Sequence, residues 1–403
     1  MDKPRARYVE AFPVDVEGRQ MIYLRDPEGF APGLAVPQPA YGLMTLMDGT
    51  RSVKALQEAV VEQFGLRVAN GDVAMLVQQL DESFLLLSDR FCAHRIQVEK
   101  DFRQATIRPS AHAGLSYPDD SEELRRLIDS FFDSTDGPGR PNGTGETSMK
   151  ALIAPHIDFN RGGPCFAWAY KALAESPPPD VFVVLGTGHS ARQSFVMSRK
   201  DFNTPFGTLK ADREVIDQVA AAAPLDVFAD EYAHKAEHSL EFQVVFLKYL
   251  FPDCDIPFVP ILCGSFHEMV EEKHSPMSAP VVSQFIDALK TALIGKRVCF
   301  IAGVDLSHVG QRFGDVEDLS KTFLEGVEKT DRELLSAAAG LDAEAYFDAV
   351  IREGDRTRVC GTSSIYTMLQ VMDAEHGELL RYDQTIDYNE PQQMVSFAGM
   401  AFY

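Results

Sequence analysis

Features that mark a membrane-spanning, secreted or nucleic-acid-binding protein are missing from this sequence. No apolar run in its 403 residues approaches the roughly 20 residues that cross a bilayer. The segment Met1–Arg7 lacks the apolar stretch of a signal peptide. The formal net charge of −22 argues against nucleic acid and anionic membrane surfaces as partners, because both require a basic face. We therefore expect a cytoplasmic protein without nucleic-acid or membrane partners.

Cysteine pairs of the Cys-x-x-Cys type are also missing, which argues against structural zinc knuckles and thioredoxin-like redox motifs. The six cysteines are Cys92, Cys165, Cys254, Cys263, Cys299 and Cys360. Because cytosolic thiols are normally reduced, we expect no structural disulfides among them.

The length of the chain favours two domains, because 403 residues exceed one ordinary core. Residues 1–105 are predicted to form a small winged-helix-like α+β module. We expect a pair of strands near Val14 and Met21–Leu24 and a short helix over Pro39–Met47. Further helices are predicted over Ser52–Phe64 and from Val73 to Leu80, with a strand over Phe84–Leu87. A winged helix that serves only as a scaffold is an equally good interpretation of this pattern.

The stretch Met47-Asp-Gly-Thr-Arg-Ser-Val53 resembles the PqqD-like modules. Those modules bind peptides in systems that contain radical-SAM enzymes. The resemblance implies that residues 1–105 recognise a peptide or a radical-SAM protein as partner.

Residues 106–403 are predicted to form an α/β domain with a central mixed β-sheet flanked by helices, because strands and helices alternate after Met149. Three apolar runs in this part each lead into a histidine or an aspartate: Lys150–Asp158, Val181–His189 and Val298–His308. Open α/β sheets place their chemistry beyond the carboxyl ends of strands. The three strand ends can therefore meet at one site. The stretches Asp315–Asp331 and Ser336–Val350 are interpreted as surface helices.

Three histidines and one aspartate follow these strands. His156 lies before Gly162-Gly163, which we expect to open the helix Phe166–Leu173. His189 follows Gly186-Thr-Gly188, a turn that favours function over packing. Asp305 can orient His308 or raise its basicity, or it can cap a short helix.

Two further motifs offer chemistry. His238 and Glu241 begin a helix and lie three residues apart, on one helical face. That spacing suits a metal site or an acid–base pair, and equally simple helix-start electrostatics. Cys360 precedes an apolar helix, where a thiolate is stabilised and serves as nucleophile or soft metal ligand.

Residues 108–403 resemble the Memo family, whose bacterial members are called protein B of the AmmeMemoRadiSam system. The family is similar in fold to the class III extradiol dioxygenases typified by the LigB subunit. The matching stretches follow one another in family order: Arg108–Pro118, Ala154–His156, Leu185–His189, Thr204–Gly207, Glu237–Glu241, Asp305–Phe313 and Val359–Gly361.

The resemblance implies one metal ion, iron or copper with zinc as an alternative, held by His156, His189 and Cys360. Asp305 and His308 would stand beside it as catalytic residues, as would His238 and Glu241. Cys360 takes the place of the dioxygenase carboxylate, and a thiolate favours softer metals such as Cu(I) or Zn(II). The chain departs from the family where Gly-Thr-Gly-His189-Ser replaces Gly-Pro-Ser-His-His.

Three functions follow as hypotheses. The first is a Memo-type metal protein with redox or dioxygenase-like chemistry on an unknown small-molecule substrate. The second is a non-catalytic partner or peptide-binding component of a radical-SAM-associated system. The third is a metal-free cysteine enzyme in which Cys360 is the nucleophile, His308 the base and Asp305 the orienting group.

Overall fold

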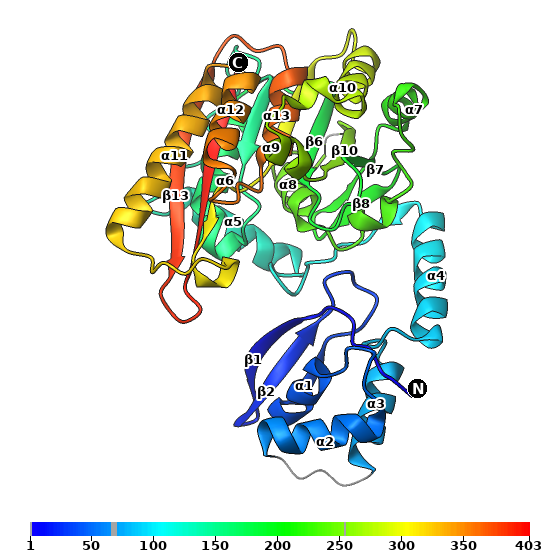
Figure 1. The fold of residues 1–403 in the computed structure, drawn as a ribbon. Coiled ribbons are helices and arrows are strands. Elements are labelled where there is room, and N and C mark those ends of the chain that lie inside the picture. The colour runs from blue at the N-terminus through cyan, green and yellow to red at the C-terminus, as the bar shows by residue number, and fades with distance from the viewer. Residues whose placement is uncertain (1, 66–70, 254) are drawn as a thin grey trace. The chain divides into compact units, whose positions relative to one another are not determined.

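The computed structural model describes residues 2–65, 71–253 and 255–403. The chain divides into two compact units, Met1–Ala105 and Thr106–Tyr403 (Figure 1). Cys254 lies outside the described residues. The other five cysteines are free thiols.

The first unit combines a small antiparallel sheet with four helices. Its strands, in the order β1-β2-β3, are β1 (Glu10–Val16), β2 (Arg19–Arg25) and β3 (Leu34–Pro37). Its helices are α1 (Gln38–Thr45), α2 (Val53–Phe64), α3 (Asp72–Glu82) and α4 (Asp89–Gln104).

The predicted bounds of α2 are confirmed by its caps. The Ser52 side chain accepts a hydrogen bond from the Ala55 N–H at the helix start, which satisfies one of the free donors there. Gly65 ends the helix in the left-handed conformation, with φ 67°, which glycine adopts at little cost.

The strand predicted over Phe84–Leu87 is wrong. Phe84 has a φ of 60°, which is incompatible with extended backbone, and Leu86 forms only an isolated bridge with Ala6. The apolar residues that suggested a strand instead fill the core of the unit, where Leu85 and Leu86 are fully buried.

The second unit is built on a mixed eight-stranded sheet, which confirms the predicted fold class. The sheet order is β12-β14-β5-β11-β6-β10-β7, and β13 also pairs with β14. The strands β5, β11, β6 and β10 run parallel, whereas β7, β12, β13 and β14 pair antiparallel with their neighbours. Their bounds are β5 (Ala151–Ala154), β6 (Val181–Thr187), β7 (Phe195–Met197), β10 (Phe258–Cys263), β11 (Val298–Gly303), β12 (His308–Val309), β13 (Gly377–Asp387) and β14 (Gln393–Phe402).

Helices cover both faces of this sheet. The helices α6 and α8 pack on β5, β6, β11 and β14, and α13 packs on β6, β10 and β11 from the other side (Figure 1). The α-helices of the unit are α5 (Ser121–Asp133), α6 (Phe159–Ala174), α7 (Arg213–Ala222), α8 (His238–Leu250), α9 (His267–Glu272), α10 (Pro280–Ala292), α11 (Lys321–Ala339), α12 (Ala343–Glu353) and α13 (Thr362–Val371). Short 3-10 helices are η1 (Glu231–His234), η2 (Pro276–Ser278) and η3 (Gln311–Phe313), and a small second sheet contains β4 (Ile107–Arg108), β8 (Asp201–Thr204) and β9 (Gly207–Leu209).

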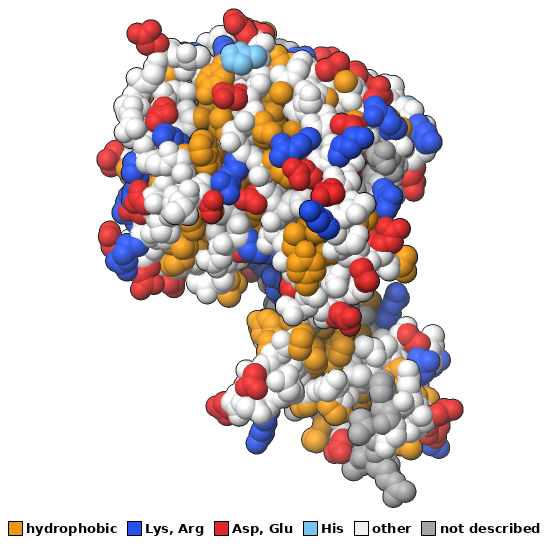
Figure 2. Space-filling model, turned by 90° about the vertical axis from the view of Figure 1, so that its left-hand side faces the viewer, with side chains coloured by type: hydrophobic (Ala, Val, Ile, Leu, Met, Phe, Trp, Pro, Cys, Tyr) orange, Lys and Arg blue, Asp and Glu red, His pale blue; other side chains and the backbone are white. Residues whose placement is uncertain are grey.

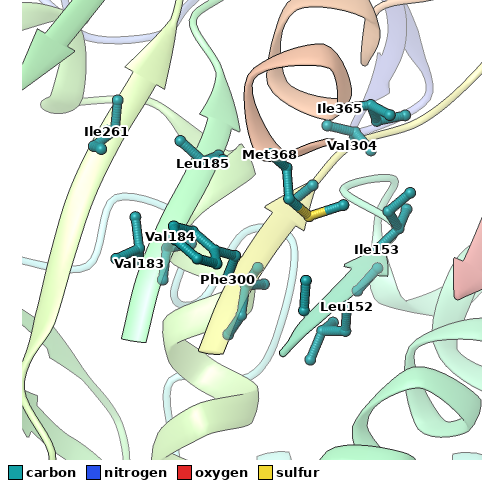
Figure 3. Close-up of a cluster of buried hydrophobic side chains, with 14 of the residues drawn as sticks. Leu152, Ile153, Val183, Val184, Leu185, Ile261, Phe300, Val304, Ile365 and Met368 are labelled. Atoms are coloured by element: carbon teal, nitrogen blue, oxygen red, sulfur yellow. The ribbon is translucent and has the colours of Figure 1, made fainter. Parts of the chain in front are cut away.

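The core of the unit lies against the central parallel strands. Figure 3 shows Leu152 of β5, Val183 and Val184 of β6, and Phe300 of β11 in one apolar cluster with Met368 of α13. Continuous apolar runs of this kind are expected where a parallel strand is covered on both faces. The apolar packing leaves polar chemistry to the ends of the strands.

Two sequence predictions about this unit need correction. Gly162 and Gly163 lie inside α6, which already begins at Phe159, and a Cβ on either would collide with the side chain of Ile157 or Phe131. The helix that contains Asp331 is not simply a surface helix, because Asp331 is fully buried. The start of α6 is fixed locally by the N-cap Asp158, whose side chain accepts from the Arg161 N–H. The burial of Asp331 is decided by hydroxyl partners from distant segments.

Charged side chains of both signs are mixed on the outside of the second unit. On the face that Figure 2 shows, lysine and arginine stand among aspartate and glutamate, so this face carries no continuous basic surface. Within the described parts of the chain, every helix is too short or too polar to traverse a lipid bilayer.

Candidate metal centre

Three histidines from different elements meet at the carboxyl ends of the parallel strands. His156 follows β5, His189 follows β6, and His238 is the first residue of α8. One nitrogen of each ring lies within 4.8 Å of one nitrogen of the others. The ring centroids are 5.0 Å (His156–His189), 5.0 Å (His156–His238) and 4.8 Å (His189–His238) apart. Three imidazoles at this spacing match a site for a single transition metal ion.

The second nitrogen of each ring faces an oxygen that can only accept a hydrogen bond. His156 Nδ1 lies 3.0 Å from the Gly303 carbonyl oxygen, and His189 Nδ1 lies 3.0 Å from Glu237 Oε1. His238 Nδ1 lies 3.3 Å from the same Oε1. A neutral ring that carries its hydrogen on Nδ1 keeps a lone pair on Nε2. The Nε2 atoms of His156 and His189 are therefore set up as ligands, with the outer hydrogen bonds that metal-bound histidines need. His238 adds a third imidazole, whose Nδ1 is within ion-pair distance of Glu237.

Glu237 is the carboxylate that links two of these histidines. Besides the two rings, it accepts hydrogen bonds from the backbone N–H groups of His189 and Ser239, both at 3.0 Å. Burial would raise the pKa of Glu237, but His189 and His238 hold it well below the ordinary value. Neutral imidazoles offset a buried negative charge in part, by donating N–H hydrogen bonds, and imidazoles that are protonated or bound to a cation do so more strongly. The residues present thus fit a metal ion.

The surroundings shift the pKa values of the three histidines in different directions. Burial lowers the pKa of His156 to about 3, and burial likewise puts the pKa of His238 well below its ordinary value. Burial also acts to lower the pKa of His189. The negative charge of Glu237 and its hydrogen bond outweigh burial, so that the pKa of His189 is raised. The His189 side chain is 42% exposed, so the site is accessible to an ion and a small molecule from solvent.

Cys360 lies beside this cluster. Its Sγ is 3.4 Å from His156 Nε2 and 3.3 Å from the Asp305 carbonyl oxygen. The sulfur does not belong to the set of mutually close ligand atoms, which consists of the three imidazoles among the described residues. Burial and the neighbouring Asp305 raise the pKa of the Cys360 thiol well above its ordinary value. A half-buried thiol whose pKa is raised in this way is a poor nucleophile without a metal ion.

Asp305 and His308 flank the same strand end. The Asp305 carboxylate accepts hydrogen bonds from the backbone N–H groups of His156 (3.0 Å) and Ile157 (3.2 Å), and burial raises its pKa to about 6. The Nδ1 of His308 lies 3.1 Å from the Leu306 carbonyl oxygen. The histidine that contacts the Cys360 thiol is His156, whereas His308 Nδ1 faces the Leu306 carbonyl oxygen. These contacts do not form the metal-free arrangement with His308 as the base.

The structure does not bring Glu241 into the cluster. Its carboxylate forms a buried ion pair with Arg108 at 2.6 Å and accepts hydrogen bonds from the Tyr117 hydroxyl and the backbone of Ala111 and His112. Burial acts to raise the pKa of Glu241, but Arg108 lowers it on balance. Glu241 holds the segment that begins at Arg108 against α8.

Glu237 is the residue that reasoning from the sequence missed. The rule that residues three apart share a helical face paired His238 with Glu241. Glu237, however, is the N-cap of α8, and its side chain accepts from Ser239. An acidic residue directly before a histidine at a helix start was the signal that could have pointed to it.

Comparison with known proteins supplies a family. The sequence profile described as "Memo-like protein" matches residues 108–401. A "MEMO1 family protein" of Aquifex aeolicus is 28% identical over all of both chains. A relative of the same description from Thermus thermophilus is 28% identical over 88% of this chain and 99% of its own. Another, from Ignicoccus hospitalis, is 30% identical over 73% of this chain and 98% of its own.

Proposed function

The chain belongs to the Memo-like protein family, and we propose that it binds one transition metal ion through the Nε2 atoms of His156, His189 and His238. The observation that carries this proposal is the orientation of the three rings. Nδ1 of each ring lies near an acceptor oxygen, and one nitrogen of each ring lies within 4.8 Å of one nitrogen of the others.

The Cys360 sulfur would lie next to the ion. Its Sγ is 3.4 Å from His156 Nε2, one of the proposed ligand atoms. Three imidazoles suit iron, copper and zinc alike, and a thiolate shifts the preference toward Cu(I) and Zn(II). We propose copper, iron or zinc as the resident metal, and ligation by the thiolate would favour copper or zinc over iron.

The ion would supply redox or oxygen chemistry to a small molecule at the exposed side of His189. The protein's own groups would orient that molecule: His308, whose Nδ1 is engaged by the Leu306 carbonyl, can exchange a proton through its other nitrogen. Asp305 holds the backbone of His156 in place. A metal-dependent oxidoreductase is thus the activity that we propose.

Metal titration of the metal-free protein tests the proposal. We expect one equivalent of Co(II) or Cu(I) to bind to the wild type, with binding strongly weakened in His156→Ala and His238→Ala. His267→Ala is the matched control, because His267 is an exposed histidine of α9 and its loss should leave binding unchanged. Equal affinity of His238→Ala and His267→Ala would refute the three-histidine site.

The same titration separates nitrogen from sulfur ligation. A sulfur-to-metal charge-transfer band in the Co(II)-loaded protein that disappears in Cys360→Ser would place the thiolate on the ion. A Co(II) spectrum that is unchanged in Cys360→Ser would remove Cys360 from the ligand set and leave the three histidines.

We further propose that residues 1–105 recognise a peptide or a radical-SAM protein. The match to the Ignicoccus relative takes in 98% of that protein but only 73% of this chain. Residues 106–403 make up about the same share of this chain. The Aquifex relative, by contrast, matches from end to end. A unit that some relatives have and others lack is suited to a partner-specific task.

Capture of peptides from the host lysate tests this second proposal. The full chain and a chain without residues 1–105 are immobilised, and the bound peptides are identified by mass spectrometry. Peptides held only by the full chain would support recognition by the first unit. Identical sets on both chains would contradict it.

A further inference from the structure

Asp331 is a buried carboxylate far in sequence from the metal centre. It lies in the middle of α11 and is fully buried. Its Oδ1 accepts a hydrogen bond from the Ser307 hydroxyl at 2.6 Å. Its Oδ2 accepts from the hydroxyls of Ser396 (2.6 Å) and Tyr382 (2.8 Å). An amphipathic helix normally turns its acidic residues to solvent. An aspartate that points inward and accepts from three hydroxyl groups therefore indicates a specific structural role.

The directions of these hydrogen bonds are determined by the neighbouring backbone. The Ser396 hydroxyl accepts from the Ser307 N–H at 3.0 Å and therefore donates to Asp331. The backbone N–H of Ser396 donates in turn to the Ser307 carbonyl oxygen, and the Leu306 N–H donates to the Ser396 carbonyl oxygen. Asp331 thus ties α11 to β14 and to the segment Asp305–His308 at once.

That segment is in direct contact with the candidate metal centre. The Asp305 carboxylate holds the backbone of His156, and the Asp305 carbonyl oxygen accepts from the Cys360 thiol at 3.3 Å. The Cys360 N–H donates to the Leu306 carbonyl oxygen at 3.2 Å. Any shift of Ser307 would be passed on to these neighbours, because it is bonded to Leu306 and His308.

We infer that Asp331 is a positioning residue of the metal centre, which fixes the segment Asp305–His308 through the Ser307 hydroxyl and thereby holds the half-buried Cys360 thiol against the Asp305 carbonyl oxygen. The inference rests on the proposed function for the identity of the site, but its test needs no metal ion.

Two hydroxyl variants separate positioning from plain stabilisation. Ser307→Ala and Tyr382→Phe each remove one hydroxyl donor to the same carboxylate. Ser307 belongs to the site segment, whereas Tyr382 lies on β13. We therefore expect both to lower the melting temperature and only Ser307→Ala to disturb the site.

The readout is the alkylation rate of Cys360 by iodoacetamide in the metal-free full chain, followed by peptide mass spectrometry. Cys92, an exposed cysteine of the first unit, serves as the internal reference in the same molecule. We expect the rate of Cys360 relative to Cys92 to rise about fivefold in Ser307→Ala and in Asp331→Asn. In Tyr382→Phe the ratio should stay at the wild-type value, and the Asp331→Asn, Ser307→Ala double variant should add nothing further.

Equal ratios in Ser307→Ala and Tyr382→Phe, or additive effects in the double variant, would overturn the inference. If Asp331→Asn fails to fold, the comparison of the two hydroxyl variants still decides it. Absence of metal binding in the wild type would refute the proposed function but would leave this test unaffected, because the alkylation is measured without metal.

Discussion

Two buried glutamates near the start of α8 have different partners, and they define a structural region and a candidate functional region of the second unit. On one side Glu241 meets Arg108, a cation at every accessible pH. On the other side Glu237 meets the imidazoles of His189 and His238. The first arrangement is complete in itself and serves the fold. In the second, a proton or a bound metal ion would add the positive charge that neutral imidazoles lack, and this difference makes it the candidate functional region.

The largest expected effect concerns the structural region. Glu241→Gln leaves Arg108 buried without its anion, and breaking a buried pair in this way costs about 3–5 kcal/mol. We expect that loss in the free energy of unfolding, measured by urea denaturation at pH 7. Asp180→Asn is the control, because its pair with Arg297 is exposed and should contribute less than about 1 kcal/mol. Equal losses of unfolding free energy in Glu241→Gln and Asp180→Asn would show that the buried ion pair stabilises the fold no more than the exposed one.

The stability effect of Glu241→Gln should depend on pH in a predictable direction. The pKa of Glu241 is lowered below its ordinary value of 4.5, so its contribution to stability is present above that value. The contribution is lost as the pH falls through the lower folded-state pKa. The stability gap between the wild type and Glu241→Gln should therefore be complete near neutrality and should shrink below 4.5. Urea denaturation across the acid range measures this gap, and a gap that widens in acid would contradict the assignment.

The next effect concerns the functional region. Glu237→Gln removes the carboxylate behind two proposed ligands, and such outer contacts are typically worth 10- to 100-fold in metal affinity, or about 1.4–2.7 kcal/mol. We expect Zn(II) binding, measured by calorimetry, to weaken by this factor. Glu231→Gln is the matched control, because Glu231 is a buried glutamate paired with Lys200. An affinity that drops equally in both variants would show that buried charge in general, rather than Glu237, supports the ion.

The smallest effect concerns the first unit, whose described residues contribute nothing to the metal centre. Ser52→Ala in the first unit removes the N-cap hydrogen bond of α2 and should cost about 1 kcal/mol of stability. Zn(II) affinity should not change, because the ligands all belong to the second unit. Thermal denaturation and calorimetry on the same samples measure both quantities, and a loss of affinity would contradict the independence of the two units.

Much of the fold followed from local pattern. The apolar runs that became β5, β6 and β11 are continuous because both faces of a parallel sheet are covered, and the caps of α2 were visible as Ser52 and Gly65. Strand Phe84–Leu87 failed because Phe84 adopts a positive φ, which no apolar pattern reveals. The burial of Asp331 could not be predicted from the acidic stretch Asp315–Asp331, because the three hydroxyl groups that donate to Asp331 come from segments remote in sequence.

The sequence by itself determined that histidines and an aspartate would follow parallel strands, and parallel strands end at one edge of a sheet. It could not determine which group joins His156 and His189, since that depends on how α8 docks beside the strands. The tertiary structure decided that His238 turns toward them and that Glu237 rather than Glu241 supports the rings. The reason is physical: Arg108 satisfies one carboxylate and leaves the other to the histidines.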